Sequence, residues 1–362
     1  MRLHVLAIPH TITSKEHSVC AFTQNVLKFC DMMTNIGYEI IHYGHPKSEV
    51  VCTEHVSVIS EDTYDEVYGD FDWKSKTWSS PNSWKVTQEF ENNCIKEIND
   101  RKQPGDFLLA FYGSGHQKIC DSVPDIRVVE PAIGYGNGYF AQYKVFASYA
   151  HYHAFGGNNE VLYSNNNWFN RVIPHYFDLR DFEYNSIKED YFLFMSRICE
   201  VKGIHIAQQV TREAGVKLVV AGQNIDDVEF EDHVEFVGHS DVNQRRELMK
   251  NAKALIFPTM YHEPFGKVQV EALLSGTPVI STDWGACTEI NIEGVTGFRC
   301  RNYQDFVRAI KNIDQIKPID CRRKGEEYSM DKIALMYDKY FKDLCKLNTS
   351  NGCYHLDDNL CM

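Results

Sequence analysis

The sequence has no excess of basic residues, no apolar run long enough to span a bilayer, and no internal repeat or low-complexity tract. Its 362 residues carry a net charge of −13, which argues against a nucleic-acid-binding protein because phosphate contacts need clustered Lys and Arg. The 12 cysteines are scattered and include no close pair at the spacing of a zinc or thioredoxin-like site. These absences argue against three large classes of protein before any motif is considered.

The cysteines and the N-terminus also indicate the compartment. Several cysteines lie in apolar runs, which is typical of buried free thiols. The segment Met1 to Pro9 predicts a strand rather than a signal peptide, because its apolar run is short and no cleavage site follows. We therefore expect a cytoplasmic protein in a reducing environment. Peripheral membrane contact stays open, although the sequence has no strongly basic amphipathic helix.

The length and the order of the predicted elements indicate two α/β domains. A chain of 362 residues with 43% hydrophobic and 24% charged residues suits two domains that each bury a core. Strands and helices alternate, which predicts parallel sheets covered by helices. In the first half, strands are predicted at 3–8, 38–43, within 50–59, 106–112 and 126–129, and helices at 19–35, 86–102 and 143–154. In the second half, strands are predicted at 191–196, 216–220, 234–239, 254–258 and 277–281, and helices at 204–214, 241–252, 268–274, 303–313 and 330–347.

Three segments are predicted to lie outside these elements. Residues 61–83 are rich in aromatic and acidic side chains, so they form either an acceptor-binding insertion or a surface loop packed by its own aromatics. Residues 156–167 are rich in Gly and Asn and predict a loop. Residues 179–190 are charged and resemble a linker, which places the domain boundary near 180.

The stretch from Tyr261 to Gly276 carries the strongest chemical signal. It follows a short buried strand and contains a turn with Glu263 and Gly266, and then a helix that Gly276 ends as its C-cap. The backbone N–H groups of Phe265, Gly266 and Lys267 begin this helix, which makes the turn suited to a phosphate group. Glycine also allows the backbone to come close to a ligand.

Two carboxylates belong to the same stretch. Glu263 precedes the helix, and Glu271 lies within it. A carboxylate can accept two hydrogen bonds from vicinal hydroxyls, which sugars and riboses share. The stretch therefore indicates a site for a ligand with a diphosphate and more than one diol.

This arrangement resembles the paired-glutamate motif of retaining glycosyltransferases with the GT-B fold, the large family four or "glycosyl transferases group 1" type. The resemblance implies that Glu263 binds the donor sugar and Glu271 the nucleotide ribose. Arg197 to Gly203 resembles the family's Arg…Lys-Gly turn, which implies that Arg197 and Lys202 bind the donor diphosphate. Two cations on such a turn can also stabilise a departing diphosphate.

Further turns of the second half match the family more loosely. Gly222 and Gln223 resemble its glycine turn near the donor, and Gly238 lies where family members hold the nucleobase. Ser196 stands where the family usually has glycine, and the segment 171–178 matches the signature at the domain junction only in part. The first half matches the family in pattern alone.

Three residues of the first half are candidates for lining a cleft. His10, His116 and Glu130 each follow a predicted strand, and ligands of doubly wound sheets bind at the carboxyl ends of strands. A structural role stays equally open for each of them.

From the resemblance we expect an α/β protein of the GT-B fold, with two Rossmann-like doubly wound domains facing across a cleft. The expected domains are an acceptor-side domain at 1–180 and a nucleotide-sugar-binding domain at 181–330. We expect the helix at 331–347 to cross back to the first domain and the tail at 348–362 to be frayed. A UDP-, GDP- or ADP-sugar is the expected substrate, and no cofactor or metal is expected.

The expected reaction transfers a sugar to a hydroxyl of a glycan, glycoprotein or glycolipid with retention of anomeric configuration, as in glycan biosynthesis. The alternatives are a GT-B nucleotide-sugar epimerase, which would act without an acceptor, and a non-catalytic nucleotide-sugar-binding homologue. Donor sugar, base, acceptor and oligomeric state stay open.

Overall fold

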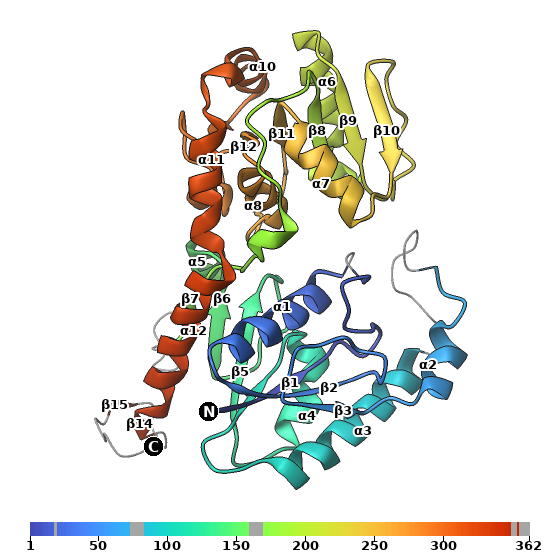
Figure 1. Cartoon of the computed structure of the whole chain (residues 1–362), viewed down its shortest axis with the longest axis vertical. Helices are drawn as coiled ribbons and strands as arrows, with labels where there is room; N and C mark the ends of the chain where they lie inside the picture. The colour runs from blue at the N-terminus through green and yellow to red at the C-terminus, as the bar shows by residue number, and fades with distance from the viewer. Residues whose placement is uncertain (18–19, 73–82, 159–168, 349–352, 355–362) are drawn as a thin grey trace. The chain divides into compact units, whose positions relative to one another are not determined.

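A computed structural model of the chain describes residues 1–17, 20–72, 83–158, 169–348 and 353–354 (Figure 1). The chain divides into two compact units. Unit 1 comprises Met1–Ala147, Tyr152–Tyr176 and Met330–Met362, and unit 2 comprises Ser148–His151 and Phe177–Ser329. The functional roles expected for the two domains stay predictions.

Unit 1 is built on a parallel sheet, in which the described residues form seven strands in the order β3-β2-β1-β4-β5-β6-β7. The strands are β1 (Arg2–Leu6), β2 (Glu39–Gly44), β3 (Glu54–Ser57), β4 (Phe107–Leu109), β5 (Arg127–Ile133), β6 (Tyr143–Phe146) and β7 (Arg171–Val172). One face is covered by α1 (Ala21–Asn35) and α12 (Met330–Cys345). The other is covered by α2 (Glu61–Tyr68), α3 (Ser83–Arg101) and α4 (Gln117–Asp121).

The central strand β4 illustrates why both faces are covered. Phe107 and Leu109 belong to the core that contains α1 and α12, whereas Leu108 belongs to the core that contains α3 and α4. All three side chains have no exposed surface. Successive side chains of a strand point to opposite faces, so an uninterrupted apolar strand needs a helical layer on each side.

Unit 2 repeats this architecture. Its described residues form a parallel sheet of six strands in the order β10-β9-β8-β11-β12-β13. The strands are β8 (Phe192–Met195), β9 (Leu218–Ala221), β10 (Val234–Gly238), β11 (Ala254–Phe257), β12 (Val279–Thr282) and β13 (Gly297–Cys300). The helices used below are α6 (Ile204–Ala214), α7 (Val242–Asn251), α8 (Lys267–Leu274), α9 (Cys287–Ile290), α10 (Tyr303–Asn312) and α11 (Pro318–Gly325). Helix α6 packs with α10, and α8 packs with α7 and α11 (Figure 1).

Each sheet has a point where the strand order reverses. In unit 1 the reversal lies between β1 and β4, and in unit 2 between β8 and β11. Ligands of open α/β sheets bind at the carboxyl ends of the strands at such a point. The loops that follow β8 and β11 are therefore where a site in unit 2 is expected.

The helix predicted at 143–154 is wrong in its first part. Residues Tyr143–Phe146 form strand β6, which pairs with β5, and helix α5 (Tyr149–Asn158) begins only afterwards. Val145 and Phe146 are fully buried in the sheet, so tertiary pairing decides the conformation of a short apolar segment that periodicity leaves ambiguous. The Ser148 hydroxyl accepts a hydrogen bond from the His151 N–H at 3.0 Å and so caps α5.

Four further helices were not predicted, namely α2, α4, α9 and α11. Helix α2 occupies the start of the segment 61–83, and the Ser60 hydroxyl accepts a hydrogen bond from the Thr63 N–H at its N-terminus. Helix α4 follows a short 3₁₀ turn, Gly113–His116, and α11 begins with Pro318 at its first turn. Short helices carry a weak periodic signal, so the caps are the clearer indication of them.

Several expectations concern residues outside the described part of the chain. Residues 73–82 hold the remainder of the aromatic and acidic segment, and residues 159–168 hold most of the predicted Gly/Asn loop. The expected frayed tail falls largely on 349–352 and 355–362. Of that region, β14 (Leu347–Asn348) pairs antiparallel with β15 (Cys353–Tyr354).

None of the helices in the described residues has the length and apolar composition needed to cross a bilayer. Most of the cysteines with described side chains are buried, and the buried free thiols include Cys20, Cys30, Cys94, Cys120, Cys287, Cys300 and Cys321.

Candidate active site

The loops that follow β8 and β11 in unit 2 are fastened to each other by their backbones. Gly203 has a φ of +77° and lies so close to the second loop that a Cβ on it would meet the Pro258 carbonyl oxygen at 2.2 Å. The Met260 N–H donates to the Val201 carbonyl oxygen at 2.9 Å. Only glycine combines this backbone conformation with such a close approach. The two loops therefore hold their side chains in fixed positions relative to each other.

This arrangement brings together Lys202, Tyr261 and Glu263. The Lys202 ammonium donates to Oε2 of Glu263 at 2.9 Å and to the Tyr261 hydroxyl at 2.6 Å. The Tyr261 hydroxyl donates to the same Oε2 at 2.5 Å. The ammonium also lies 4.7 Å from the centre of the Tyr261 ring. The side chains of Lys202 and Glu263 are only 11% and 10% exposed, so this is a largely buried ion pair closed by a tyrosine.

The electrostatics of the cluster extend to its neighbours. Burial and the Glu263 carboxylate raise the pKa of the Tyr261 hydroxyl, and the nearby Arg197 guanidinium opposes that rise. Burial, with a smaller contribution from Glu263, raises the pKa of the Cys287 thiol to about 12. Arg197 itself is exposed. The tyrosine is therefore a neutral donor to the carboxylate at any ordinary pH, and the exposed Arg197 guanidinium adds positive charge near it.

The loop after β12 holds the backbone of Glu263. Gly285 has a φ of +57°, and a Cβ on it would meet the Glu263 carbonyl oxygen at 2.9 Å and its nitrogen at 3.0 Å. The Ala286 N–H donates to the Glu263 carbonyl oxygen at 3.0 Å. These contacts fix the backbone of Glu263, so the position of its carboxylate does not depend on the side-chain rotamer alone.

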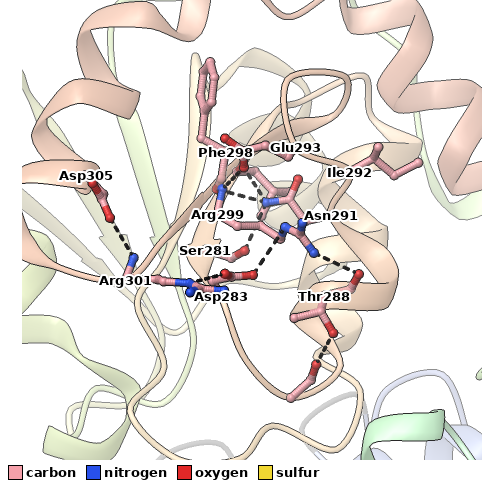
Figure 2. Close-up of polar contacts among 12 residues, drawn as sticks. Ser281, Asp283, Thr288, Asn291, Ile292, Glu293, Phe298, Arg299, Arg301 and Asp305 are labelled. Atoms are coloured by element: carbon pink, nitrogen blue, oxygen red, sulfur yellow. Dashed lines mark hydrogen bonds and ion pairs between the residues drawn. The ribbon is translucent and has the colours of Figure 1, made fainter.

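Figure 2 shows the polar contacts that fix this loop. Oδ1 of Asp283, just after β12, lies 3.4 Å from Nε of Arg299, and Oδ2 lies 2.6 Å from Nε of Arg301. The Arg299 guanidinium donates to the Thr288 carbonyl oxygen at 3.2 Å. The Asn291 amide donates to three oxygens of β12 and β13, those of Val279, Ser281 and Phe298. This network ties the loop beside Glu263 to the sheet.

The first turn of α5 is attached to the same region. Glu289 accepts hydrogen bonds from the N–H groups of Tyr149 at 3.0 Å and Ala150 at 2.7 Å. The Ser148 hydroxyl donates to the Pro264 carbonyl oxygen at 2.6 Å. A carboxylate at a helix N-terminus satisfies N–H groups that have no partner within the helix. These bonds explain why Ser148–His151 belongs to unit 2 although the rest of α5 does not.

Helix α8 begins where the sequence predicted. Gly266 lies at its N-cap with a φ of +78°, and a Cβ on it would meet Nε2 of Gln269 at 2.6 Å. Phe265 is buried and stacks on Phe177 with ring centres 6.4 Å apart. Lys267 is half-buried in the first turn. The helix N-terminus thus follows Glu263 directly, as a phosphate-binding turn would require.

Glu271 lies in α8 and is paired with a residue that the sequence did not single out. The Arg245 guanidinium of α7 donates to Oε2 of Glu271 at 2.8 Å. The two side chains are 34% and 18% exposed. Asp241 begins α7 with a capping box, which was recognisable from the sequence, but the approach of α7 to α8 depends on tertiary packing.

The turns after β8, β9 and β10 lie together. Gly222 has a φ of +144°, and a Cβ on it would meet the Ser196 carbonyl oxygen at 1.8 Å. Its N–H donates to the Gly238 carbonyl oxygen at 2.9 Å, and the Ile198 N–H donates to that of Gln223 at 2.8 Å. The predicted residues Gly222, Gln223 and Gly238 therefore form one edge of unit 2, at the carboxyl ends of its strands.

His10 and His116 lie at the reversal point of the unit 1 sheet. Nε2 of His116 lies 2.9 Å from the Ala7 carbonyl oxygen, which links the loop after β4 to the loop after β1. The side chain has no exposed surface, and burial lowers its pKa to about 3. The His10 ring lies 5.6 Å from the Tyr112 ring, and burial lowers its pKa to about 4. Both histidines are therefore neutral near pH 7, and His116 holds backbone together.

Glu130 lies within β5 and not after it as predicted, because the strand extends to Ile133, and its side chain also holds backbone. Its carboxylate accepts hydrogen bonds from the Tyr135 hydroxyl at 2.8 Å and from the N–H groups of Phe140 and Ala141 at 3.0 and 2.9 Å. It has no exposed surface, and burial raises its pKa. The structure thus gives Glu130 a complete set of partners inside unit 1.

This edge of unit 2 carries basic side chains, and a metal site is not evident among the described residues. Within the described ranges, no three His, Cys, Asp or Glu side chains are grouped to hold a metal ion. Arg197 and Lys202 lie on the turn after β8, and Lys267 begins α8 after the turn that carries Glu263.

Comparisons with known proteins agree with this geometry. Residues 178–327 match the family described as "Glycosyl transferases group 1". The O-antigen chain mannosyltransferase RfbU of Salmonella typhimurium is 29% identical over 186 residues, which cover 48% of this chain and 52% of that protein. The chain thus matches about half the length of this relative.

Solved structures match over nearly the whole chain. AviGT4, a glycosyltransferase involved in avilamycin A biosynthesis, has a TM-score of 0.63 at 17% identity and covers 95% of this chain and 98% of its own. Anabaena Alr3699/HepE, solved in complex with UDP and glucose, has a TM-score of 0.63 at 14% identity and covers 94% and 99%.

The two parallel sheets, each with a reversal point, and these matches define a protein of the GT-B glycosyltransferase fold. The match to the glycosyl transferases group 1 family covers residues 178–327, which lie within unit 2. The expected fold class is confirmed.

Proposed function

We propose that this protein is a retaining glycosyltransferase that moves a sugar from a nucleotide-sugar to an acceptor hydroxyl. The observation that carries the proposal is the buried Lys202–Tyr261–Glu263 cluster. It lies after β8 and β11, at the reversal point of the unit 2 sheet. It also lies inside the region that matches the family.

Diphosphate binding falls to the cations and the helix N-terminus. Lys202 and Arg197 lie on the turn after β8, and α8 begins at Lys267. Charge-assisted hydrogen bonds from such groups neutralise a diphosphate and stabilise it as it departs. In this scheme Glu263 accepts hydrogen bonds from sugar hydroxyls, and Glu271 accepts them from the ribose.

The reaction needs no enzymic nucleophile. The bond between the anomeric carbon and the leaving phosphate oxygen breaks, and a bond from that carbon to the acceptor oxygen forms on the same face. The acceptor proton passes to the leaving phosphate oxygen, so the products are the glycosylated acceptor and the nucleoside diphosphate. The protein's part is to orient the donor and stabilise the charge that develops on the phosphate.

The domain roles and the acceptor side belong to the proposal. We assign acceptor binding to residues 1–180 and donor binding to 181–330, with His10, His116 and Glu130 as supports of the loops at the sheet edge of unit 1. The structural neighbour solved with UDP and glucose favours a UDP-sugar as the first donor to test. The mannosyltransferase relative favours a glycan as the acceptor class. The free cysteines support a reducing compartment.

The test is ligand-detected NMR of the purified protein with UDP-, GDP- and ADP-sugars, followed over time. Binding with slow release of free sugar is expected, because water replaces the missing acceptor. Conversion of the bound nucleotide-sugar to an epimer would instead identify an epimerase. If no nucleotide-sugar binds, the proposed function is wrong.

A further inference from the structure

The Lys202–Glu263 pair is satisfied without any ligand. The ammonium and the carboxylate are 2.9 Å apart, and both are about nine-tenths removed from water. The Tyr261 hydroxyl bridges them, at 2.6 Å from the ammonium and 2.5 Å from the carboxylate. Removing one partner of a buried ion pair leaves the other charge uncompensated, which is strongly unfavourable. A ligand that separates the two groups must therefore offer something to each.

The proposed donor, on whose assignment this inference rests, would offer a partner to each group. Its diphosphate attracts Lys202, and its sugar hydroxyls can donate to Glu263. A nucleoside diphosphate without a sugar offers a partner to Lys202 alone. Glu263 would then keep only the Tyr261 hydroxyl as a donor from the cluster, in a site that is largely out of water.

We propose that the Lys202–Glu263 pair makes the site discriminate between a nucleotide-sugar and the free nucleoside diphosphate. The loaded nucleotide replaces both halves of the pair, whereas the free nucleotide replaces one. After sugar transfer, Glu263 loses its sugar partner, Lys202 returns to it, and the nucleotide is released. The pair thus favours the bound nucleotide-sugar over the bound nucleoside diphosphate, and the same two side chains promote release of the product.

Tyr261 is the residue that positions the Glu263 carboxylate. Its hydroxyl donates to Oε2 of Glu263, and its ring lies 4.7 Å from the ammonium. The Trp284 indole N–H donates to the Tyr261 carbonyl oxygen at 3.2 Å and so holds the tyrosine backbone. When Lys202 turns to the diphosphate, the hydroxyl keeps the carboxylate in place for the sugar.

The test compares the affinities of paired ligands for the wild type and for Glu263→Gln. UDP and UDP-glucose, and the corresponding GDP and ADP pairs, are titrated by calorimetry. Glutamine keeps the shape of the side chain but removes the charge that holds Lys202. Glu263→Gln is therefore expected to bind the free nucleoside diphosphate about tenfold more tightly than the wild type, because a buried ion pair no longer competes. The ratio of the nucleotide-sugar affinity to the free-nucleotide affinity should fall by more than about tenfold, because Glu263→Gln also weakens the contact with the sugar.

Two variants serve as controls. Glu91→Gln removes the carboxylate of another Lys–Glu pair, 2.5 Å from Lys118 in unit 1, and should leave both affinities unchanged. The double variant Lys202→Met/Glu263→Gln should lose the gain in nucleotide affinity, because no ammonium remains to be released. Glu263→Ala is measured alongside and should show the same gain as Glu263→Gln.

The outcomes separate the two proposals. If the wild type binds nucleotide-sugars but neither Glu263 variant binds free nucleotide more tightly, the discrimination is wrong and the proposed function stands. If the gain persists in the double variant, Lys202 is not its source, and the inference is again wrong. If the wild type binds none of these ligands, the proposed function fails, and the inference fails with it.

Discussion

The Arg245 guanidinium lies 2.8 Å from the Glu271 carboxylate, and about one-third of the arginine side chain is exposed. The pair between Lys202 and Glu263 has a similar separation of 2.9 Å but only about one-tenth of each side chain exposed. Both proposed donor-binding glutamates are thus paired with a cation from a neighbouring loop or helix. The difference in exposure predicts different consequences when the cation is removed, because water screens the first pair and not the second.

Arg245→Met is expected to change nucleotide-sugar affinity by less than about threefold, because exposed ion pairs contribute only about 0–1 kcal/mol. Glu271→Ala should weaken binding by about tenfold or more, because it removes the acceptor proposed for the ribose hydroxyls. Calorimetric titration of both variants with the same donor makes the comparison. If Arg245→Met weakened binding as much as Glu271→Ala, Arg245 would itself touch the nucleotide or be needed to aim Glu271.

Lys202→Met is expected to lower kcat by at least about 100-fold, as the loss of one preorganised donor to a developing negative charge does in other enzymes. The matched control is Lys217→Met, which removes a lysine paired with Glu235 at 2.5 Å, with both side chains about half exposed. Sugar release from the identified donor is followed for each variant, together with its melting temperature. Near-normal turnover in a folded Lys202→Met protein would contradict the assignment of Lys202 to diphosphate binding.

The part of the site that could be predicted is the part that local sequence determines. Glu263, Gly266 and Glu271 lie on one turn and the helix that follows it, so a short stretch of sequence carries both their chemistry and their spacing. Tyr261 belongs to the same stretch, but its contact with Lys202 depends on how two loops pack, and that packing follows from Gly203 against Pro258. Arg245 was missed for the same reason, because nothing in α7 alone indicates a partner in α8.

The fold shows the same division. The long amphipathic helices and the buried apolar strands were predictable from periodicity, whereas Tyr143–Phe146 became a strand because β5 pairs with it. Glu130 shows why a polar residue at a predicted strand end is ambiguous, because the strand β5 in fact continues past it to Ile133. The carboxylate could have faced a ligand, but Phe140 and Ala141 bring their N–H groups to it from a loop ten residues away.

Gly222→Ala is expected to destabilise unit 2 by at least about 3 kcal/mol, because a Cβ would fall 1.8 Å from the Ser196 carbonyl oxygen at a φ of +144°. The control is Gly215→Ala, at a φ of +69° with no atom within 4 Å of the added Cβ. It should cost only the strain of a left-handed residue, about 1 kcal/mol. Urea unfolding followed by circular dichroism measures both. Equal losses for the two variants would show that the Ser196 turn yields to the new methyl group.

Acid should destabilise the protein through its buried histidines, and His116 allows the sign to be worked out. Burial lowers its pKa from 6.5 to about 3 in the folded chain. Between these values the unfolded chain binds more protons, so the free energy of unfolding rises with pH and is lost as the pH falls from about 6.5 towards 3. From pH 7 to pH 4.5 the loss of unfolding free energy through this one residue is about 2–3 kcal/mol.

His116→Gln keeps a donor for the Ala7 carbonyl oxygen and should reduce the difference in unfolding free energy between pH 7 and pH 4.5 by about 2–3 kcal/mol. The control His205→Gln, at an exposed position, should leave this difference unchanged. Urea unfolding at both pH values decides the matter, and an unaltered pH difference in His116→Gln would mean that His116 is not buried as a neutral ring.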